Sequence, residues 1–140
     1  MKILLPVDGS PYTKRMLAWL VTHDEWLKAD HEFTVLTVVP VIPPHAAAMF
    51  PADQLKSYYE DTAEAIFKPI RKFVAKHNLA TNFVSKVGHA PDVIAKVADK
   101  GKHDLIVMGS HGHSNLMNLV MGSVTNQVLA RSKAPVLLVR

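Results

Sequence analysis

The chain contains no cysteine among its 140 residues. This absence excludes disulfides, thiolate metal sites, iron–sulfur clusters and a cysteine nucleophile. Long hydrophobic runs are also missing, and no stretch approaches the roughly 20 apolar residues of a membrane-spanning helix. The apolar run at the start is broken by Pro6 and Asp8, so it is too short for a signal-peptide core. We therefore expect a cytoplasmic protein with no membrane partner.

Acidic residues are fewer than basic ones, with 12 Asp and Glu against 16 Lys and Arg, which gives a net charge of +4. The basic residues are scattered along the chain. Their densest group, Lys68, Arg71, Lys72 and Lys76, has helical spacing and follows several acidic residues, which is typical of a solvated helix face. Zinc-finger spacing and an aromatic platform for RNA are both absent. We therefore expect no nucleic-acid partner.

The periodicity switches repeatedly between strand-like and helix-like patterns. A length of 140 residues with 49% apolar residues is typical of one globular domain, spanning residues 1–140. Continuous or β-branched apolar runs predict five strands at residues 2–7, 33–39, 82–87, 104–108 and 134–139. Helical spacing predicts four helices, from Pro11 to about Trp26, at about 53–77, from the turn at 88–91 to Gly101, and at 123–131.

Prolines mark two features between these elements. Four prolines within residues 40–51 predict a long loop, whose tip at Met49 and Phe50 either covers a bound base or packs within the loop. Pro69 lies inside the predicted helix 53–77 and predicts a kink or a local break there.

Alternating strands and helices predict an α/β fold with a doubly wound parallel sheet. In such folds a ligand lies beyond the carboxyl ends of the strands, where the strand order reverses. The strand ends at Asp8, Val39 and Gly109 are therefore the candidate positions for a site.

The pattern with chemical content follows the fourth strand. Gly109 and Gly112 come directly after it, and nine residues separate Gly112 from Gly122-Ser123, giving G-x2-G-x9-G-[ST]. Glycines let backbone amides approach an anion, and a helix N-terminus adds a partial positive charge. The hydroxyls of Ser110, Ser123 and Thr125 can add hydrogen bonds. The pattern indicates a phosphate site. It is neither a P-loop nor a dinucleotide-binding G-x-G-x-x-G motif.

The segments that carry this pattern resemble the universal stress protein family. The resemblance extends over the whole chain, through residues 3–10, 104–112, 119–125 and 135–139. It implies one five-stranded sheet in order 3-2-1-4-5 with four helices, of the adenine nucleotide alpha hydrolase-like type. The intact glycine pattern is similar to that of the ATP-binding branch, and family members usually form homodimers through their last strand, here around Val136–Val139.

The resemblance also implies which residues hold the nucleotide. Pro6, Val7 and Asp8 would line the adenosine end, and the Val39 backbone would hold adenine. The phosphate and ribose side would be formed by Met108, Gly109, Ser110, Gly112, His113, Gly122, Ser123, Val124 and Thr125. His113 stands where many relatives have Arg or Lys. Because no Lys or Arg lies between Gly109 and Gly122, amides, Mg²⁺ on the phosphates and histidine would offset the charge of ATP, and ADP and AMP stay as alternatives.

Some of the proposed site residues also have purely structural interpretations. Asp8 could be a turn residue that caps the next helix, and Ser123 a simple N-cap. Two histidines, His111 and His113, are too few for a metal site, so we expect none, and we assign no catalytic residue. The favoured function is an ATP-binding regulatory switch in the stress response. The alternatives are a slow ATP hydrolase or phosphotransferase, with Asp8, His111 and His113 orienting water, and a protein-interaction module that does not use nucleotide.

Overall fold

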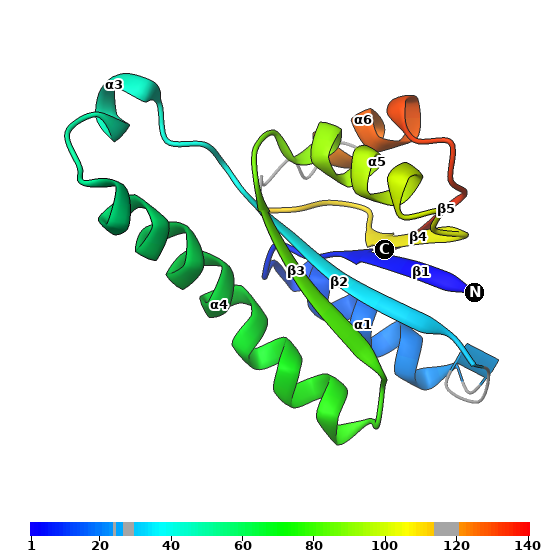
Figure 1. Ribbon diagram of the computed structural model, residues 1–140. Coiled ribbons are helices and arrows are strands. Elements are labelled where there is room, and N and C mark those ends of the chain that lie inside the picture. Colours follow the sequence, from blue (N-terminus) through cyan, green and yellow to red (C-terminus); the bar gives the residue numbers. More distant parts are fainter. Residues whose placement is uncertain (24, 27–29, 114–120) are drawn as a thin grey trace.

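A single five-stranded parallel sheet forms the centre of the protein (Figure 1). The computed structural model describes residues 1–23, 25–26, 30–113 and 121–140. The strands lie in the order β3-β2-β1-β4-β5, which confirms the predicted α/β fold. Their bounds are β1 Lys2–Pro6, β2 Glu32–Val39, β3 Thr81–Val87, β4 Leu105–Gly109 and β5 Val136–Val139. The order reverses between β1 and β4. The connections that leave the carboxyl ends of these two strands therefore run to opposite faces of the sheet and leave a crevice between them.

Helices cover both faces of the sheet (Figure 1). Their bounds are α1 Pro11–Thr22, α3 Pro44–Ala47, α4 Ala52–Lys76, α5 Ala90–Lys100 and α6 Ser123–Arg131. Side chains of α1 and α4 share one buried cluster with β1 and β2, and those of α5 and α6 share a second cluster on the opposite face. No described helix is long and apolar enough to cross a bilayer.

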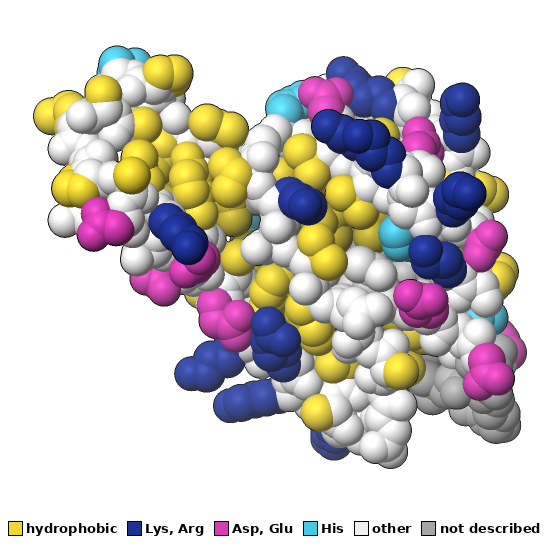
Figure 2. Space-filling model, viewed as in Figure 1, with side chains coloured by type: hydrophobic (Ala, Val, Ile, Leu, Met, Phe, Trp, Pro, Cys, Tyr) yellow, Lys and Arg dark blue, Asp and Glu magenta, His cyan; other side chains and the backbone are white. Residues whose placement is uncertain are grey.

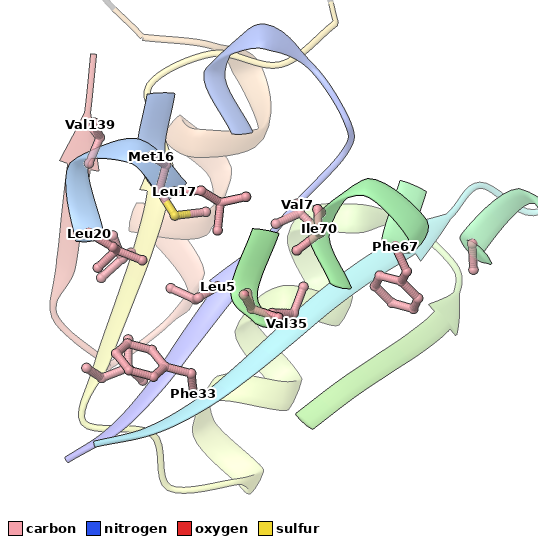
Figure 3. Packing of buried hydrophobic residues seen from close by; sticks show 14 of the residues in the cluster. Leu5, Val7, Met16, Leu17, Leu20, Phe33, Val35, Phe67, Ile70 and Val139 are labelled. Carbon is pink, nitrogen blue, oxygen red and sulfur yellow. The ribbon is translucent and has the colours of Figure 1, made fainter. Parts of the chain in front are cut away.

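The first strand explains why the sequence shows continuous rather than alternating apolarity. Ile3, Leu4 and Leu5 are all fully buried. Leu5 packs on the α1 and α4 side, where Figure 3 shows side chains of both helices meeting the sheet, whereas Leu4 packs on the α5 and α6 side. Since successive side chains of a strand point to opposite faces, a central strand must be apolar at every position.

Helix α1 begins as predicted and ends earlier. Ser10 is the N-cap, with its hydroxyl accepting from the amide of Thr13, and Pro11 is the first helical residue. The sequence pattern predicts a helix to about Trp26, but α1 ends at Thr22. The side chain of His23 explains this end, because its Nδ1 lies 2.7 Å from the Trp19 carbonyl oxygen, the acceptor that the next helical amide would use.

The two proline-marked segments differ from expectation. The predicted loop 40–51 contains one short helix, α3, and then leads directly into α4. Helix α4 continues through Pro69 as a single 25-residue helix, so the predicted local break is not found. Pro69 and Ala65, whose carbonyl loses its helical donor, are both exposed, and water can satisfy that carbonyl. Most of the predicted connection between Gly109 and Met121, residues 114–120, lies outside the described residues.

Candidate functional site

A cleft of about 230 Å³ opens at the crevice between the carboxyl ends of β1 and β4. The start of α6 forms its far wall. Most of the residues predicted for the site line it, namely Pro6, Val7, Asp8, Met108, Gly109, Gly112, His113, Gly122, Ser123, Val124 and Thr125. The fold therefore brings together two sequence segments that are about 100 residues apart.

Asp8 is held firmly at the end of β1. Its Oδ1 accepts from the amide of Ser10 at 2.9 Å and from the hydroxyl of Thr13 at 3.0 Å. The Thr13 hydroxyl oxygen in turn accepts from the Asp8 amide at 3.2 Å. Both interpretations of Asp8 thus agree with the geometry: one carboxylate oxygen orders the turn before α1, and the side chain also lines the cleft.

Each glycine of the G-x2-G-x9-G pattern lies where an added side chain would be crowded. A Cβ on Gly109 would lie 2.7 Å from the Cβ of Tyr12, and one on Gly112 would lie 2.6 Å from Asp8 Oδ2. A Cβ on Gly122 would lie 3.2 Å from the Cα of His111, because the Gly122 amide donates to the Ser110 carbonyl at 2.7 Å. The pattern therefore reflects close approach of the β4–α6 connection to both sides of the cleft.

The first turn of α6 faces the cleft with its backbone amides. Gly122 is the N-cap and makes no side-chain cap. The leading amides of a helix have no partner within the helix, and they carry a partial positive charge. Ser123 is exposed in this first turn and lines the cleft. This is the arrangement by which proteins bind phosphate at a helix N-terminus.

The other two hydroxyls of the predicted site have structural partners. Thr125 is 2% exposed, and its hydroxyl donates to the Gly109 carbonyl at 3.2 Å. Ser110 is also 2% exposed, and its oxygen lies 2.9 Å from His111 Nδ1. Ser110 is not among the residues that line the cleft. Both side chains fasten the connection after β4 in place.

The two loop histidines have separate positions. His113 Nε2 donates to the Asp8 carbonyl oxygen at 2.6 Å and so spans the cleft from one strand end to the other. The His111 ring stacks against Tyr12, with ring centroids 4.9 Å apart. Among the described residues no group of three or more His, Asp and Glu side chains could hold a metal ion.

Val39 lies beside the cleft rather than in its lining. Its carbonyl accepts the Gly88 amide at 3.0 Å, and its side chain lines a groove against α4. The neighbouring Val38 lines the cleft instead. Because side chains alternate along β2, Leu36 and Val38 share the face toward α5. The role of the Val39 backbone stays a prediction.

Sequence reasoning missed several lining residues: Thr13, Leu36, Val38, Ala90 and Ile94. His111 also lines the cleft, and the sequence analysis named it only under the hydrolase alternative. Alternation along β2 groups Leu36 with Val38, but it does not say which face of the sheet the two side chains take. Ala90 and Ile94 lie at the start of α5, whose placement against β2 and β1 depends on the crossover rather than on any motif.

The fold and the cleft define a class of protein: a doubly wound α/β domain with an anion-binding type of cleft at its switch point. Residues 1–140 match the model of the universal stress protein family. The chain belongs to this family.

The relatives extend over most of the chain. Universal stress protein Slr1230 of Synechocystis sp. is 30% identical over 139 residues, covering 99% of this chain and 42% of the relative. Universal stress protein MJ0577 of Methanocaldococcus jannaschii is 33% identical over 88 residues, covering 63% of this chain and 54% of the relative. The chain thus spans about half or less of the length of these two relatives.

Solved structures show the same fold. The structure of MJ0577 superposes with a TM-score of 0.81 at 28% identity, covering 99% of this chain and 94% of that chain. A universal stress protein from Archaeoglobus fulgidus, solved in complex with dAMP, has a TM-score of 0.66 at 19% identity and covers 100% of this chain and 98% of that chain. At 19% identity this second likeness establishes the fold alone.

Proposed function

We propose that the chain binds an adenine nucleotide in the cleft between β1 and β4, with ATP as the regulatory ligand. The observation that carries the proposal is the meeting of three closely packed glycines with the N-terminus of α6 at the switch point. This combination provides backbone amides for phosphate without side chains in the way. The same family fold with dAMP bound is consistent with it, as a property of that relative.

The cleft has one apolar and one polar end, which suits a nucleotide. Val38, Ile94 and Met108 offer apolar surface for a base. On the polar side, Ser123 and the amides of α6 face the position for phosphates. A Mg²⁺ ion would travel with the phosphates and offset charge that this connection, lacking Lys and Arg, does not neutralise. The described residues therefore fit a nucleotide that brings its own cation.

A backbone hydrogen bond links the border of the cleft to the edge strand β5. The Ser110 amide donates to the Val139 carbonyl at 2.9 Å, so the connection that borders the cleft is tied to β5. We expect a homodimer to form along β5, Val136–Val139, as the family resemblance implies. A ligand that shifts the β4–α6 connection changes the position of this edge, and such a differential contact is what a switch requires.

Thermal unfolding with and without ligand tests the proposal. Millimolar Mg-ATP and AMP should raise the melting temperature by roughly 5–10 °C at saturation, because a ligand that binds only the folded state stabilises it by mass action, and GTP should not. The Gly122→Val variant should lose the shift, because a Cβ there meets the backbone of His111. Ala130→Val places the same β-branched side chain on the exposed side of α6 and should keep the shift. No shift with any nucleotide in the wild-type protein contradicts the proposal.

A further inference from the structure

Strand β3 forms one outer edge of the sheet (Figure 1). Its seven residues pair in parallel with β2 over their whole length. No described segment pairs with its other side. An edge strand presents a row of unpaired amides and carbonyls that can accept another strand.

The register defines which backbone groups point outward. The Gly88 amide donates to the Val39 carbonyl, so Lys86, two residues earlier, also points its backbone toward β2. Backbone groups alternate in direction along a strand. The amides and carbonyls of Ser85 and Val87 therefore point to the free edge, and both residues are exposed.

Two grooves flank this free edge, one on each face of the sheet. The groove toward α4, about 400 Å³, is mostly apolar, with Leu55, Tyr59 and Val87 in its lining. The groove toward α5, about 780 Å³, has Val93 and Val97 in its lining. Figure 2 views this side of the molecule and shows hydrophobic side chains in two areas with lysine and arginine side chains around them.

The two grooves differ in charge. The groove toward α5 is lined by Lys2, Lys86, Lys96 and Lys100 against one acid, Glu32. Within the described residues none of Lys86, Lys96 and Lys100 forms an ion pair. In the groove toward α4, Lys56 and Glu60 lie 3.9 Å apart and offset one another. Lys86 is in the lining of both grooves. The groove toward α4 is therefore mostly apolar, with two lysines against one acid, and the groove toward α5 carries the larger surplus of positive charge, with four lysines against one acid.

We propose that the free edge of β3 binds an extended, acidic segment of a partner protein, which adds to the sheet as a sixth strand. Side chains of an added strand alternate between the two faces. Apolar side chains at every second position enter the groove toward α4, and acidic side chains between them meet the lysines of the groove toward α5. Backbone hydrogen bonds at Ser85 and Val87 supply affinity, and the alternation supplies specificity.

A protein segment suits this surface better than a nucleic acid. Tyr59 is the single Phe, Tyr or Trp side chain among the described residues that line the two grooves, and it lies in the groove toward α4. Its hydroxyl oxygen accepts the Ile42 amide at 3.0 Å. Nucleic acid binding to a groove of this kind relies on aromatic stacking. In the groove toward α4, Leu55 and Val87 favour aliphatic side chains.

A fluorescein-labelled peptide of four Val-Glu repeats is the probe, and its binding is followed by fluorescence anisotropy with the full chain. We expect the wild-type protein to bind this peptide saturably, with an affinity that falls as salt is added. The Lys86→Glu variant should bind it at least tenfold more weakly. Two control peptides should also bind the wild-type protein at least tenfold more weakly: four Val-Lys repeats, which reverse the charge, and a block peptide of four Val followed by four Glu, which removes the alternation.

The edge itself is tested by a matched pair of variants. Ser85→Pro removes one outward amide without removing a bond to β2, since proline is tolerated where its nitrogen faces solvent. We expect it to weaken peptide binding at least tenfold and to leave the fold unchanged by circular dichroism, whereas Ser85→Ala keeps the amide and the binding. If Ser85→Pro does not fold, N-methylation of alternate amides of the peptide removes the same hydrogen bonds from the other partner.

Several results would overturn the proposal. These are no peptide binding to the wild-type protein, equal binding of the block or lysine peptide, unchanged binding by folded Ser85→Pro, and tighter binding of a 12-nucleotide single-stranded DNA at the same edge. A change in oligomeric state on Ser85→Pro would show that a second copy of the chain occupies the edge instead. Nucleotide-induced thermal shifts are measured in parallel, so this outcome is separate from that of the nucleotide proposal.

Discussion

Asp8 and Gly112, 104 positions apart in the sequence, lie against each other across the cleft. The Oδ2 of Asp8 is 2.6 Å from the point where a Cβ on Gly112 would lie. The other carboxylate oxygen of Asp8 is held by Ser10 and Thr13, so the side chain cannot turn away without losing hydrogen bonds. The strand end and the glycine connection are therefore matched in shape at this point.

The Gly112→Ala variant tests this contact. Gly112 does not have a positive φ angle, so the added methyl acts by contact with Asp8 rather than by backbone strain. We expect the free energy of unfolding to fall by about 1–2 kcal/mol, since Asp8 must give up hydrogen bonds that are worth about 1 kcal/mol each. Urea denaturation measures this change. In the Asp8→Ala background the same substitution should cost much less, and equal costs in both backgrounds would show that the two residues are not coupled.

Ser123→Asp separates the phosphate function of α6 from its stability. A carboxylate in the first turn of a helix favours the macrodipole, so the melting temperature without ligand should stay equal or rise slightly. The same negative charge lies where we expect phosphate to bind. The apparent affinity for Mg-ATP, measured from the thermal shift at increasing ligand concentration, should therefore fall at least tenfold. Asn126→Asp makes the same change of charge one turn further on, outside the cleft lining, and should keep most of the affinity. Equal loss in both variants would point to a general charge effect.

We expect the contact of Asp92 in α5 with His89 and with Arg131 of α6 to depend on pH. The hydrogen bond from His89, 2.8 Å from Asp92 Oδ2, together with Arg131 at 2.7 Å from Oδ1, lowers the pKa of Asp92 below its ordinary value of 3.8 and outweighs the opposing effect of desolvation. Because the pKa is lower in the folded state, this contribution to stability is fully present above pH 3.8 and is lost as the pH falls through the folded pKa. Asp92 is exposed, so the effect on stability is small.

Carbon-detected NMR titration of the Asp92 carboxyl group measures this pKa directly. We expect His89→Ala to raise the pKa toward 3.8, since it removes the largest cause of the shift. His77→Ala, at the end of α4 and without contact to Asp92, should leave it unchanged. A midpoint at or above 3.8 in the wild-type protein would contradict the assignment of the hydrogen bond.

The sequence pattern predicts a doubly wound parallel sheet and the position of its switch point, and the resemblance to the universal stress protein family implies the strand order and most of the cleft residues. Five apolar runs between helical patterns admit few parallel topologies, and the glycine spacing places the connection after β4 at the switch point. The end of α1 was not predictable in the same way. It depends on the side chain of His23 taking the Trp19 carbonyl, a local contact that periodicity does not contain.

The continuity of α4 through Pro69 and the position of Val38 show what the sequence pattern leaves open. A proline within a helical pattern predicts a kink or a local break, and α4 has no break, because water can satisfy the exposed carbonyl that Pro69 leaves without a donor. Val38 rather than Val39 lines the cleft, because the direction of a strand side chain depends on register with β1. Register is a property of the assembled sheet.

The His103 side chain gives a prediction about stability at the other end of the molecule. Both ring nitrogens are buried and have no hydrogen-bond partner among the described residues. The ring packs against Gly101, where an added Cβ would lie 2.6 Å from His103 Cε1. Burying a polar group without a hydrogen bond costs about 1–3 kcal/mol, and an apolar side chain of similar size avoids this cost.

We therefore expect His103→Leu to raise the free energy of unfolding by about 0.5–1.5 kcal/mol, as measured by urea denaturation at pH 7. His45→Leu, at an exposed position in α3, should change it by less than about 0.5 kcal/mol. A destabilised His103→Leu protein would mean that the ring nitrogens have partners in solution, such as an ordered water molecule, and that these partners stabilise the turn after α5.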